Sequence, residues 1–251
     1  QDYPEREKEL GDEVLRVEAL TNRRVKHCSV SVRAGEIVGF AGLVGAGRTE
    51  LSRVIFGIDP VRDGRILVDG KEIKITRPLD AIKAGIALVP EDRKDLGLIL
   101  GMSVKDNMLL PKLGTFTSPV LNKKDISNIT GTYIQDLSIA LASEEEEVKN
   151  LSGGNQQKGV IAKWMAMNPK ILIMDEPTRG IDIGAKSEIY AIMRKLTEEG
   201  MSIIMISSEM AEIQKVSDRV IVMHEGSVTG EMSVDEATQA TIMNAAIGME
   251  N

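Results

Sequence analysis

The glycine-rich segment Gly42–Thr49 restricts the possible folds of this chain more than any other part of its sequence. It follows the apolar run Glu36–Ala41, which is typical of a buried strand, and it precedes Leu51, Val54 and Ile55, which share one face of a helix. The segment matches the phosphate-binding pattern G-x-x-x-x-G-K-[ST] at every fixed position except the lysine. A strand, a glycine loop and a helix in this order predict an α/β fold that can hold a phosphate group.

Glycines in such a loop allow consecutive backbone N–H groups to point toward phosphate oxygens. The helix that follows presents its positive end, and the hydroxyl of Thr49 can bind Mg²⁺. A dinucleotide-binding fingerprint is excluded, because Glu50 stands where its third glycine is required. For the loop taken alone, a plain turn between a strand and a helix is the alternative. The candidate phosphate-binding residues are Gly42, Leu43, Val44, Gly45, Ala46, Gly47, Arg48, Thr49 and Glu50.

Further apolar runs predict two kinds of β-structure. Ile171–Met174 and Ser202–Ile206 are separated by the helical stretch Gly184–Glu199, an order that favours parallel pairing, and Ile86–Val89 is another strand. Shorter runs bounded by glycine turns predict a small antiparallel layer. These runs are Val14–Val17, Val30–Val32 and Arg65–Val68. A terminal pair of strands, Arg219–Met223 and Ser227–Thr229, precedes a closing helix expected over Val234–Gly248.

The chain is expected to divide into an ATPase-like core and an inserted helical part. Residues 93–150 are predicted to form a mostly helical subdomain, in which Ser103 and Asp106 resemble a helix-capping pair. Residues 13–92 and 151–251 form the core. Residues 1–12 are mostly charged and begin with Gln, so we interpret them as a linker and the chain as a piece of a longer protein.

Composition excludes several classes of protein. The 31 Lys and Arg residues against 38 Asp and Glu residues give a net charge of −7, which makes a nucleic acid an unfavourable partner. No apolar run approaches the roughly 18 to 20 residues that cross a bilayer. The one cysteine, Cys28, cannot form an internal disulfide and fits a reducing environment.

Two adjacent carboxylates end the apolar run Ile171–Met174. In parallel sheets, ligands bind at the carboxyl ends of the strands, so Asp175 is placed to bind Mg²⁺ and Glu176 to activate an attacking water. An apolar strand that ends in Asp-Glu is common by itself. The glycine loop upstream strengthens the interpretation that these two carboxylates belong to a nucleotide site.

The segment Leu151–Gln157 contains a second candidate anion site. Ser152 is suited to cap a helix whose first N–H groups, with Gly153 and Gly154, would form another nest for a phosphate. One nucleotide site hardly needs two such nests. We therefore expect this nest to contact the γ-phosphate of a nucleotide that another domain holds, with a capped surface helix as the alternative.

Together these segments resemble the ATP-binding cassette family over most of the chain, from Val14 to about Met249. They are most similar to the second cassette of the fused ATPase subunit of bacterial ribose, galactose and xylose importers. Five segments in register carry the resemblance: Gly42–Glu50, Pro90–Lys94, Leu151–Lys158, Asp175–Gly180 and Ser207–Met210.

The resemblance implies a P-loop nucleotide-binding domain with a parallel sheet core, an antiparallel β layer and an inserted helical subdomain. It implies ATP and Mg²⁺ as ligands, with Thr49 and Asp175 at the metal, Glu176 as the catalytic carboxylate, and Asp182 in a loop that signals between two cassettes. Implied partners are a second cassette on the same full-length chain, a transmembrane sugar permease and, indirectly, a periplasmic sugar-binding protein. The implied location is peripheral, on the cytoplasmic face of the inner membrane.

Three departures from the family pattern bear on hydrolysis at the chain's own loop. Arg48 replaces the lysine, Glu91 replaces a glutamine that usually contacts Mg²⁺ and water, and Ser208 replaces a switch histidine. Two functions stay open: an ATPase domain that couples hydrolysis to import of a ribose-like monosaccharide, and a hydrolytically degenerate module that completes the ATP site of its partner cassette. A cassette of DNA repair or translation is disfavoured by the acidic balance.

Overall fold

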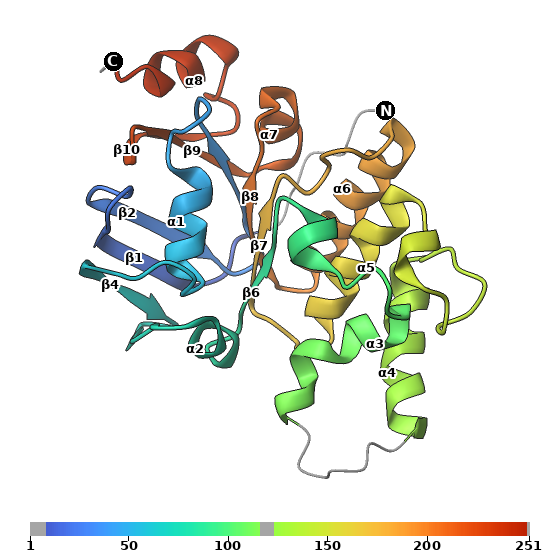
Figure 1. Ribbon diagram of the computed structural model, residues 1–251. Helices are drawn as coiled ribbons and strands as arrows, with labels where there is room; N and C mark the ends of the chain where they lie inside the picture. Colours follow the sequence, from blue (N-terminus) through green and yellow to red (C-terminus); the bar gives the residue numbers. More distant parts are fainter. Residues whose placement is uncertain (1–8, 116–122, 250–251) are drawn as a thin grey trace. The chain divides into compact units, whose positions relative to one another are not determined.

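A computed structural model describes residues 9–115 and 123–249 (Figure 1). The described residues form two compact units. Unit 1 holds those of Gln1–Leu88, Lys170–Glu176 and Met193–Asn251, and unit 2 holds those of Val89–Pro169 and Pro177–Ile192. Most of the predicted linker, residues 1–8, lies outside the described residues. The predicted division at 92/93 and 150/151 stays a prediction.

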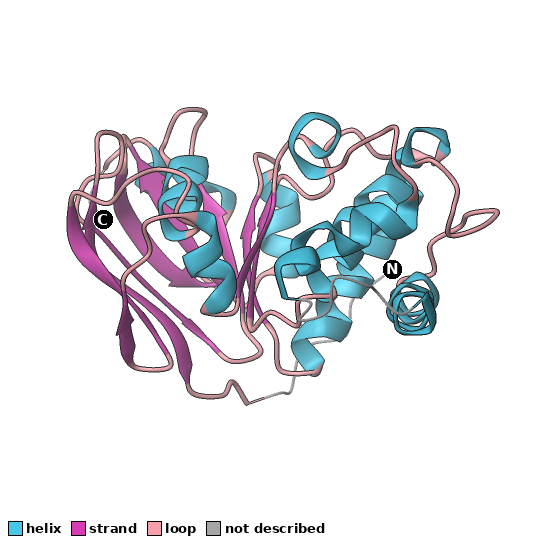
Figure 2. Ribbon diagram, turned by 60° about the horizontal axis from the view of Figure 1, so that its bottom comes forward, coloured by secondary structure: helices cyan, strands magenta, loops and turns pink. Residues whose placement is uncertain are grey.

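Unit 1 contains the predicted parallel sheet (Figures 1 and 2). Parallel pairing joins β3 to both β8 and β9, and β7 to β8, whereas β10 pairs antiparallel with β9. Every residue of β3, β7 and β8 is buried, as expected for strands covered on both faces. Within the described residues the strand order is β10 (Ser227–Ser233), β9 (Arg219–His224), β3 (Ile37–Ala41), β8 (Ser202–Ile206), β7 (Ile171–Asp175) and β6 (Ile86–Val89).

The predicted antiparallel layer is a second sheet of unit 1. Buried and less buried residues alternate along β2, so one face of this sheet packs inward. The pairs β1–β2, β1–β4 and β4–β5 are all antiparallel. Within the described part of the chain the order is β2 (Cys28–Arg33), β1 (Glu13–Thr21), β4 (Asp63–Val68) and β5 (Lys71–Ile73). The strand β5 was not predicted, because three residues are too few for a periodic pattern.

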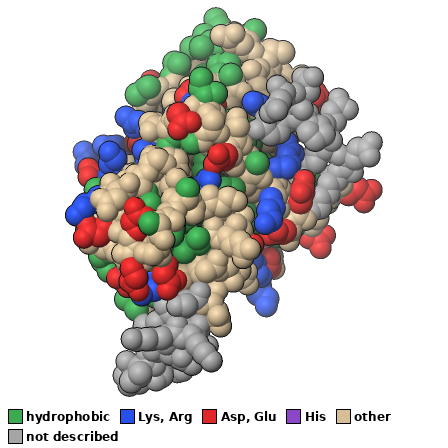
Figure 3. Space-filling model, turned by 90° about the vertical axis from the view of Figure 1, so that its right-hand side faces the viewer, with side chains coloured by type: hydrophobic (Ala, Val, Ile, Leu, Met, Phe, Trp, Pro, Cys, Tyr) green, Lys and Arg blue, Asp and Glu red, His purple; other side chains and the backbone are tan. Residues whose placement is uncertain are grey.

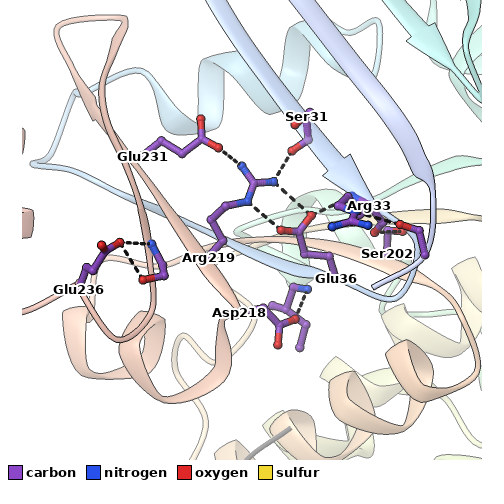
Figure 4. Close-up of polar contacts among 11 residues, drawn as sticks. Ser31, Arg33, Glu36, Ser202, Asp218, Arg219, Glu231 and Glu236 are labelled. Carbon is purple, nitrogen blue, oxygen red and sulfur yellow. Dashed lines mark hydrogen bonds and ion pairs between the residues drawn. The ribbon is translucent and has the colours of Figure 1, made fainter. Parts of the chain in front are cut away.

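A buried charge network joins the two sheets of unit 1 (Figure 4). The guanidinium of Arg219, on β9, donates to Glu36 from Nε at 2.8 Å and from Nη2 at 3.1 Å. Nη2 also donates to the backbone carbonyl of Ser31 on β2 at 2.7 Å. Glu36 is 1% exposed and immediately precedes β3, so this network anchors the start of the strand that leads into the glycine loop.

Four helices in the described part of unit 1 complete its core. The helix α7 packs on β3, and α8 packs on β9 and β10. Ile213, Val222 and Ile242 belong to the apolar cluster beneath α7 and α8. The helices are α1 (Arg48–Ile55), α2 (Pro78–Lys83), α7 (Met210–Val216) and α8 (Gln239–Ala246).

The predicted closing helix over 234–248 was wrong at its start. The strand β10 continues to Ser233, whose N–H and hydroxyl both donate to the carboxylate of Glu236 in a turn. Thr238 then caps α8 by accepting from the N–H of Thr241 at 3.1 Å. Polar side chains that bond to the local backbone therefore delay the helix to Gln239.

Unit 2 is helical in its described residues. Ser103 caps α3 as predicted, because its hydroxyl accepts from the N–H of Asp106 at 3.0 Å. The division between the units falls inside α6, after Ile192. The elements are a π-helical turn η1 (Arg93–Gly97), α3 (Val104–Leu109), a 3₁₀ turn η2 (Leu110–Thr115), α4 (Lys123–Asp136), a 3₁₀ turn η3 (Val148–Asn150), α5 (Gly153–Met165) and α6 (Ile183–Glu198).

In the described residues, the helices and the surface charges agree with the predictions made from composition. None of the helices there combines the length and apolar character needed to cross a membrane. On the described part of the face in Figure 3, acidic and basic side chains lie interspersed. This mixture agrees with the modest net charge of −7.

Candidate functional site

The glycine loop connects β3 to α1 in unit 1, as predicted. Gly42, Gly45 and Gly47 have φ angles of 150°, 80° and 103°, which side chains rarely adopt. A Cβ at Gly42 would lie 2.5 Å from the carbonyl oxygen of Met223, whereas one at Gly45 would meet nothing within 4 Å. The loop is therefore packed at its start and open at Gly45, where a ligand can approach the backbone.

The remaining loop residues differ in exposure. Val44 is 96% exposed and Leu43 is 45% exposed, whereas Ala46 is buried and donates its N–H to the carbonyl of Leu43 at 3.0 Å. Leu43 and Val44 thus form the outer tip of the loop, and Ala46 fixes its inner turn.

The turn between β9 and β10 packs against the glycine loop. Sequence reasoning missed this contact. Gly226 donates its N–H to the carbonyl of Ala46 at 2.8 Å, and it accepts from the N–H of Lys26 at 2.7 Å. A Cβ at Gly47 would lie 2.9 Å from the Cα of Gly226. The sequence marked Glu225-Gly226 only as a turn, since nothing local links it to a loop about 180 residues upstream.

The carboxylate of Asp175 ends β7 and is nearly enclosed. Asp175 is 3% exposed, and among the described residues its Oδ1 atom meets no hydrogen-bond donor. Burial raises the pKa of Asp175 from 3.8 to about 6, opposed by a hydrogen bond with Thr49. A buried carboxylate oxygen without a donor, beside a threonine hydroxyl, fits the oxygen ligands that Mg²⁺ prefers. The pair predicted to bind the metal is thus brought together.

Glu176 lies beside Ser208, a contact that the sequence analysis did not predict. The Ser208 hydroxyl donates to Oε2 of Glu176 at 3.2 Å. The backbone of Glu176 is in the left-handed region, with φ of 47°, and its N–H bonds to the carbonyl of Ile206 at 2.9 Å. Burial raises the pKa of Glu176, whereas the Ser208 hydrogen bond and the charge of Arg48 oppose that rise. A carboxylate with a raised pKa is a better proton acceptor near neutral pH.

Arg48 is the first residue of α1 and is buried, with 8% of its surface exposed. Its Nη1 atom donates to the backbone carbonyl of Ser207 at 2.5 Å. Burial lowers the pKa of Arg48, and the charges of Glu176 and Asp175 oppose that effect. The guanidinium is thus bound within unit 1 to the loop that carries Ser208. A role for Arg48 toward phosphate stays a prediction.

A cavity of about 540 Å³ lies beside the carboxyl-terminal end of the glycine loop. Arg24 forms an ion pair with Glu50 across it at 2.9 Å, and Arg53 bonds to both oxygens of Asp59 at 2.8 and 3.0 Å. The cavity is large enough for part of a small ligand. Its lining residues are Asn22, Arg23, Arg24, Thr49, Glu50, Arg53, Asp59, Pro60 and Arg62.

The second candidate anion site lies in unit 2, at the start of α5. Ser152 is exposed and caps the helix, as predicted, by accepting from the N–H of Asn155 at 3.4 Å. Gly154 is buried, and a Cβ there would lie 2.6 Å from the Cβ of Ala185 on α6. The first N–H groups of a helix have no partners within it. The N–H groups at the start of α5, next to the exposed Ser152, can therefore donate to an anion.

Two more predicted residues lie in unit 2 and have partners there. Glu91 forms an ion pair with Arg179. Asp182 accepts from the N–H of Ala185 at 3.0 Å and so caps α6. Sequence reasoning did not assign a partner to Glu91, although Arg179 belongs to the Asp175–Gly180 segment. The structure thus groups the loop, Asp175, Glu176 and Ser208 in unit 1, and groups Glu91, Ser152–Gly154 and Asp182 in unit 2.

This fold and these two sites define a P-loop nucleotide-binding protein with the fold of an ATP-binding cassette. A nucleotide-free cassette from an ABC transporter superposes with a TM-score of 0.81 at 21% identity, over 94% of this chain and 99% of that one. The family model described as "ABC transporter" matches residues 25–179. The chain therefore belongs to the ABC transporter family.

Relatives with known names are considerably closer in sequence. The ribose import ATP-binding protein RbsA of Bacillus licheniformis is 49% identical over 248 residues, which are 98% of this chain and 50% of that protein. RbsA of Bacillus subtilis is 48% identical over 248 residues, with the same coverage. The chain thus spans about half the length of these relatives.

Proposed function

We propose that this chain is a nucleotide-binding ATPase domain of an ABC importer for a monosaccharide, with a ribose-like sugar favoured. The similarity to ribose import proteins supports the choice of sugar. The observation that carries the nucleotide site is the enclosed Oδ1 of Asp175, which among the described residues lacks a donor while Thr49 lies beside the same carboxylate. Thr49 and Asp175 would hold Mg²⁺, which would neutralise phosphate charge during hydrolysis.

The residues of unit 1 would then have separate roles in ATP hydrolysis. The loop Gly42–Thr49 binds the phosphates through its backbone N–H groups. Glu176 orients a water molecule and accepts its proton, and Ser208 holds the carboxylate through the hydrogen bond at 3.2 Å. The cavity lined by Arg24 and Glu50 would hold the rest of the nucleotide.

Several partners follow from this function. We infer a second cassette on a longer chain, since the relatives are about twice as long. A transmembrane sugar permease and, indirectly, a periplasmic sugar-binding protein complete the importer. The domain would then act peripherally, at the cytoplasmic face of the inner membrane, with no nucleic acid involved.

A second candidate function is a degenerate module that binds nucleotide and hydrolyses little of it. Two contacts favour it: Arg48 is bound to the Ser207 carbonyl, and Glu91 is bound to Arg179. In this case the exposed Ser152 and the glycines after it would serve the nucleotide of the partner cassette. The two candidates differ only in whether Glu176 contributes to turnover.

Uptake measurements test the proposal. Cells that lack the gene for the intact subunit should lose uptake of radiolabelled ribose and recover it with the wild-type gene but not with Asp175→Asn. Galactose and xylose are the comparison sugars. Normal ribose uptake in the deletion strain would contradict the assignment to ribose, and failure of this chain to bind Mg·ATP in calorimetry would contradict the nucleotide site itself.

A further inference from the structure

Arg93 occupies the point in unit 2 where three segments of the chain meet. Its Nη1 donates to the carbonyl of Arg179 at 2.7 Å, and its Nη2 donates to the carbonyl of Gly180 at 3.1 Å. Its Nε lies 3.4 Å from Oε1 of Gln156 on α5. One guanidinium thus connects η1, the start of α5 and the loop that leads to Asp182.

Gly153 packs closely against this guanidinium. A Cβ at Gly153 would lie 2.8 Å from Nη2 of Arg93 and 3.3 Å from the carbonyl oxygen of Gly180. The second glycine, Gly154, makes the close approach to Ala185 described above, and α5 and α6 lie side by side (Figure 1). The turn Ser152–Gly154 therefore packs directly against Arg93 and the residues around Asp182.

Further contacts hold Arg93 itself in place. Asp92 caps η1 by accepting from the N–H groups of Lys94 at 2.8 Å and Asp95 at 3.1 Å. The carbonyl of Gly97, at the end of η1, accepts from Lys163 on α5 at 2.9 Å. The backbone of η1 is thus held at both ends, and the hydrogen bonds of the guanidinium orient the Arg93 side chain from there.

A parallel link joins the same two segments. Glu91, two residues before Arg93, is ion-paired with the side chain of Arg179, whose carbonyl Arg93 binds. The Glu91 side chain is 40% exposed, so this ion pair alone would contribute little. The two hydrogen bonds from Arg93 are directional and end on backbone carbonyls, so they hold the loop itself, and burial lowers the pKa of this arginine without removing its charge.

We propose that Arg93 is a positioning residue that holds the signature turn Ser152–Gly154 and the loop Arg179–Asp182 in one arrangement, so that both reach a nucleotide of the partner cassette together. This inference rests on the proposed function. Arg93 does not touch nucleotide. A small displacement of a phosphate contact is enough to slow turnover by about 100-fold, which makes such positioning consequential.

Hydrogen exchange tests the geometry. In the intact subunit, Arg93→Ala should increase amide exchange in peptides that cover 152–157 and 179–185 at least tenfold. Arg93→Lys should increase it less, since an ammonium can still reach one carbonyl. Arg16→Ala is the control, because Arg16 makes exposed ion pairs with Glu13 and Glu18. Unchanged exchange in Arg93→Ala would overturn the proposal.

Steady-state phosphate release tests the consequence. We expect Arg93→Ala to lower kcat about 100-fold with KM for ATP changed less than threefold and an unaltered melting temperature. A purely structural role would instead lower the melting temperature, and that result, like an unchanged kcat, would overturn the inference. If the wild-type subunit releases no phosphate, the proposed function fails, which is a different outcome.

A double-mutant cycle gives an independent check. Gly153→Ala alone places a methyl group against Nη2 of Arg93 and should lower kcat strongly. In the Arg93→Ala background the 2.8 Å contact is absent and the nearest atom is the Gly180 carbonyl oxygen at 3.3 Å, so the second substitution should cost much less than it does in the wild-type background. Full additivity of the two losses would show that the residues act separately and would overturn the proposal.

Discussion

The guanidinium of Arg48 donates a hydrogen bond to the backbone carbonyl of Ser207, at an N–O distance of 2.5 Å. These residues are 159 positions apart and belong to the glycine loop and to the segment that carries Ser208. A lysine at position 48 is the usual phosphate ligand of such a loop. In this chain the cation instead stabilises the protein backbone next to Glu176.

We expect Arg48→Lys to tighten binding of Mg·ATP by this chain about tenfold, or about 1.4 kcal/mol. A compact ammonium fits between phosphate oxygens better than a planar guanidinium does, and it frees the Ser207 carbonyl. Calorimetric titration measures the change, with Arg16→Lys as the control, because Arg16 makes exposed ion pairs and does not line the cavity beside the loop. Weaker or unaltered binding in Arg48→Lys would contradict the prediction.

Asp175→Asn should stabilise the ligand-free chain at pH 7.5 and have little effect at pH 4. The folded-state pKa of this carboxyl is raised from 3.8 to about 6, so the folded protein binds its proton more tightly than the unfolded chain does. Stability from this group is therefore present at low pH and is lost as the pH rises through about 6. At pH values well above 6, the raised pKa means that the ionised carboxylate lowers the free energy of unfolding by about 3 kcal/mol.

Urea unfolding at the two pH values measures this effect. Asp59→Asn is the matched control with the opposite sign, because the hydrogen bond from Arg53 lowers the pKa of Asp59. Removing that charge should destabilise the chain at pH 7.5. Destabilisation by Asp175→Asn at pH 7.5 would refute the burial argument. The same variant should also lose Mg²⁺-dependent binding of ATP.

Ser152→Ala in the intact subunit should lower ATPase activity by about 10² to 10³, whereas Glu176→Gln should lower it much less. Ser152 is exposed and the turn Ser152–Gly154 has all of its expected residues, while unit 1 has Arg48 and Ser208 where reactive contacts are expected. One preorganised phosphate contact is worth about 3 to 4 kcal/mol. Phosphate release with the permease present is the measurement. Equal losses in the two variants would mean that both cassettes hydrolyse ATP.

Gly226→Ala should weaken ATP binding at least tenfold. A Cβ there would lie 2.1 Å from the carbonyl oxygen of Arg24, so the turn that supports Ala46 and Gly47 must shift. Gly200→Ala is the control, because Gly200 also has a positive φ but meets nothing within 4 Å. Both variants should lose about 1 to 2 kcal/mol of stability from backbone strain. Calorimetry should separate them, and equal affinities would exclude the supporting role of Gly226.

The elements that depend on local pattern could be predicted from the sequence. The strand, glycine loop and helix around Gly42–Thr49, and the caps Ser103 and Ser152, follow from periodicity and from side chains that bond three residues ahead. The family resemblance assigned roles to Glu176 and Ser208 separately, whereas their 3.2 Å hydrogen bond is seen only in the structure.

Contacts between distant segments could not be predicted. Arg93 and Gly180 are 87 residues apart, and nothing near Arg93 in the sequence indicates that its side chain binds backbone carbonyls. The resemblance likewise gave Arg48 the position of a phosphate ligand, but its bond to Ser207 depends on where β8 ends. Long side chains such as arginine reach partners that only the folded chain defines.

The anchoring of β3 has a consequence for the entropy of ligand binding. Glu36 is locked to Arg219 just before the strand, and the N–H of Ile37 donates to Asp218 at 2.7 Å (Figure 4). At the other end, Gly226 holds the carbonyl of Ala46. Because these contacts hold both ends of the glycine loop, the loop is already ordered before a ligand binds. Little conformational freedom is then lost on association, so the ligand-free and ligand-bound loops should have nearly the same backbone.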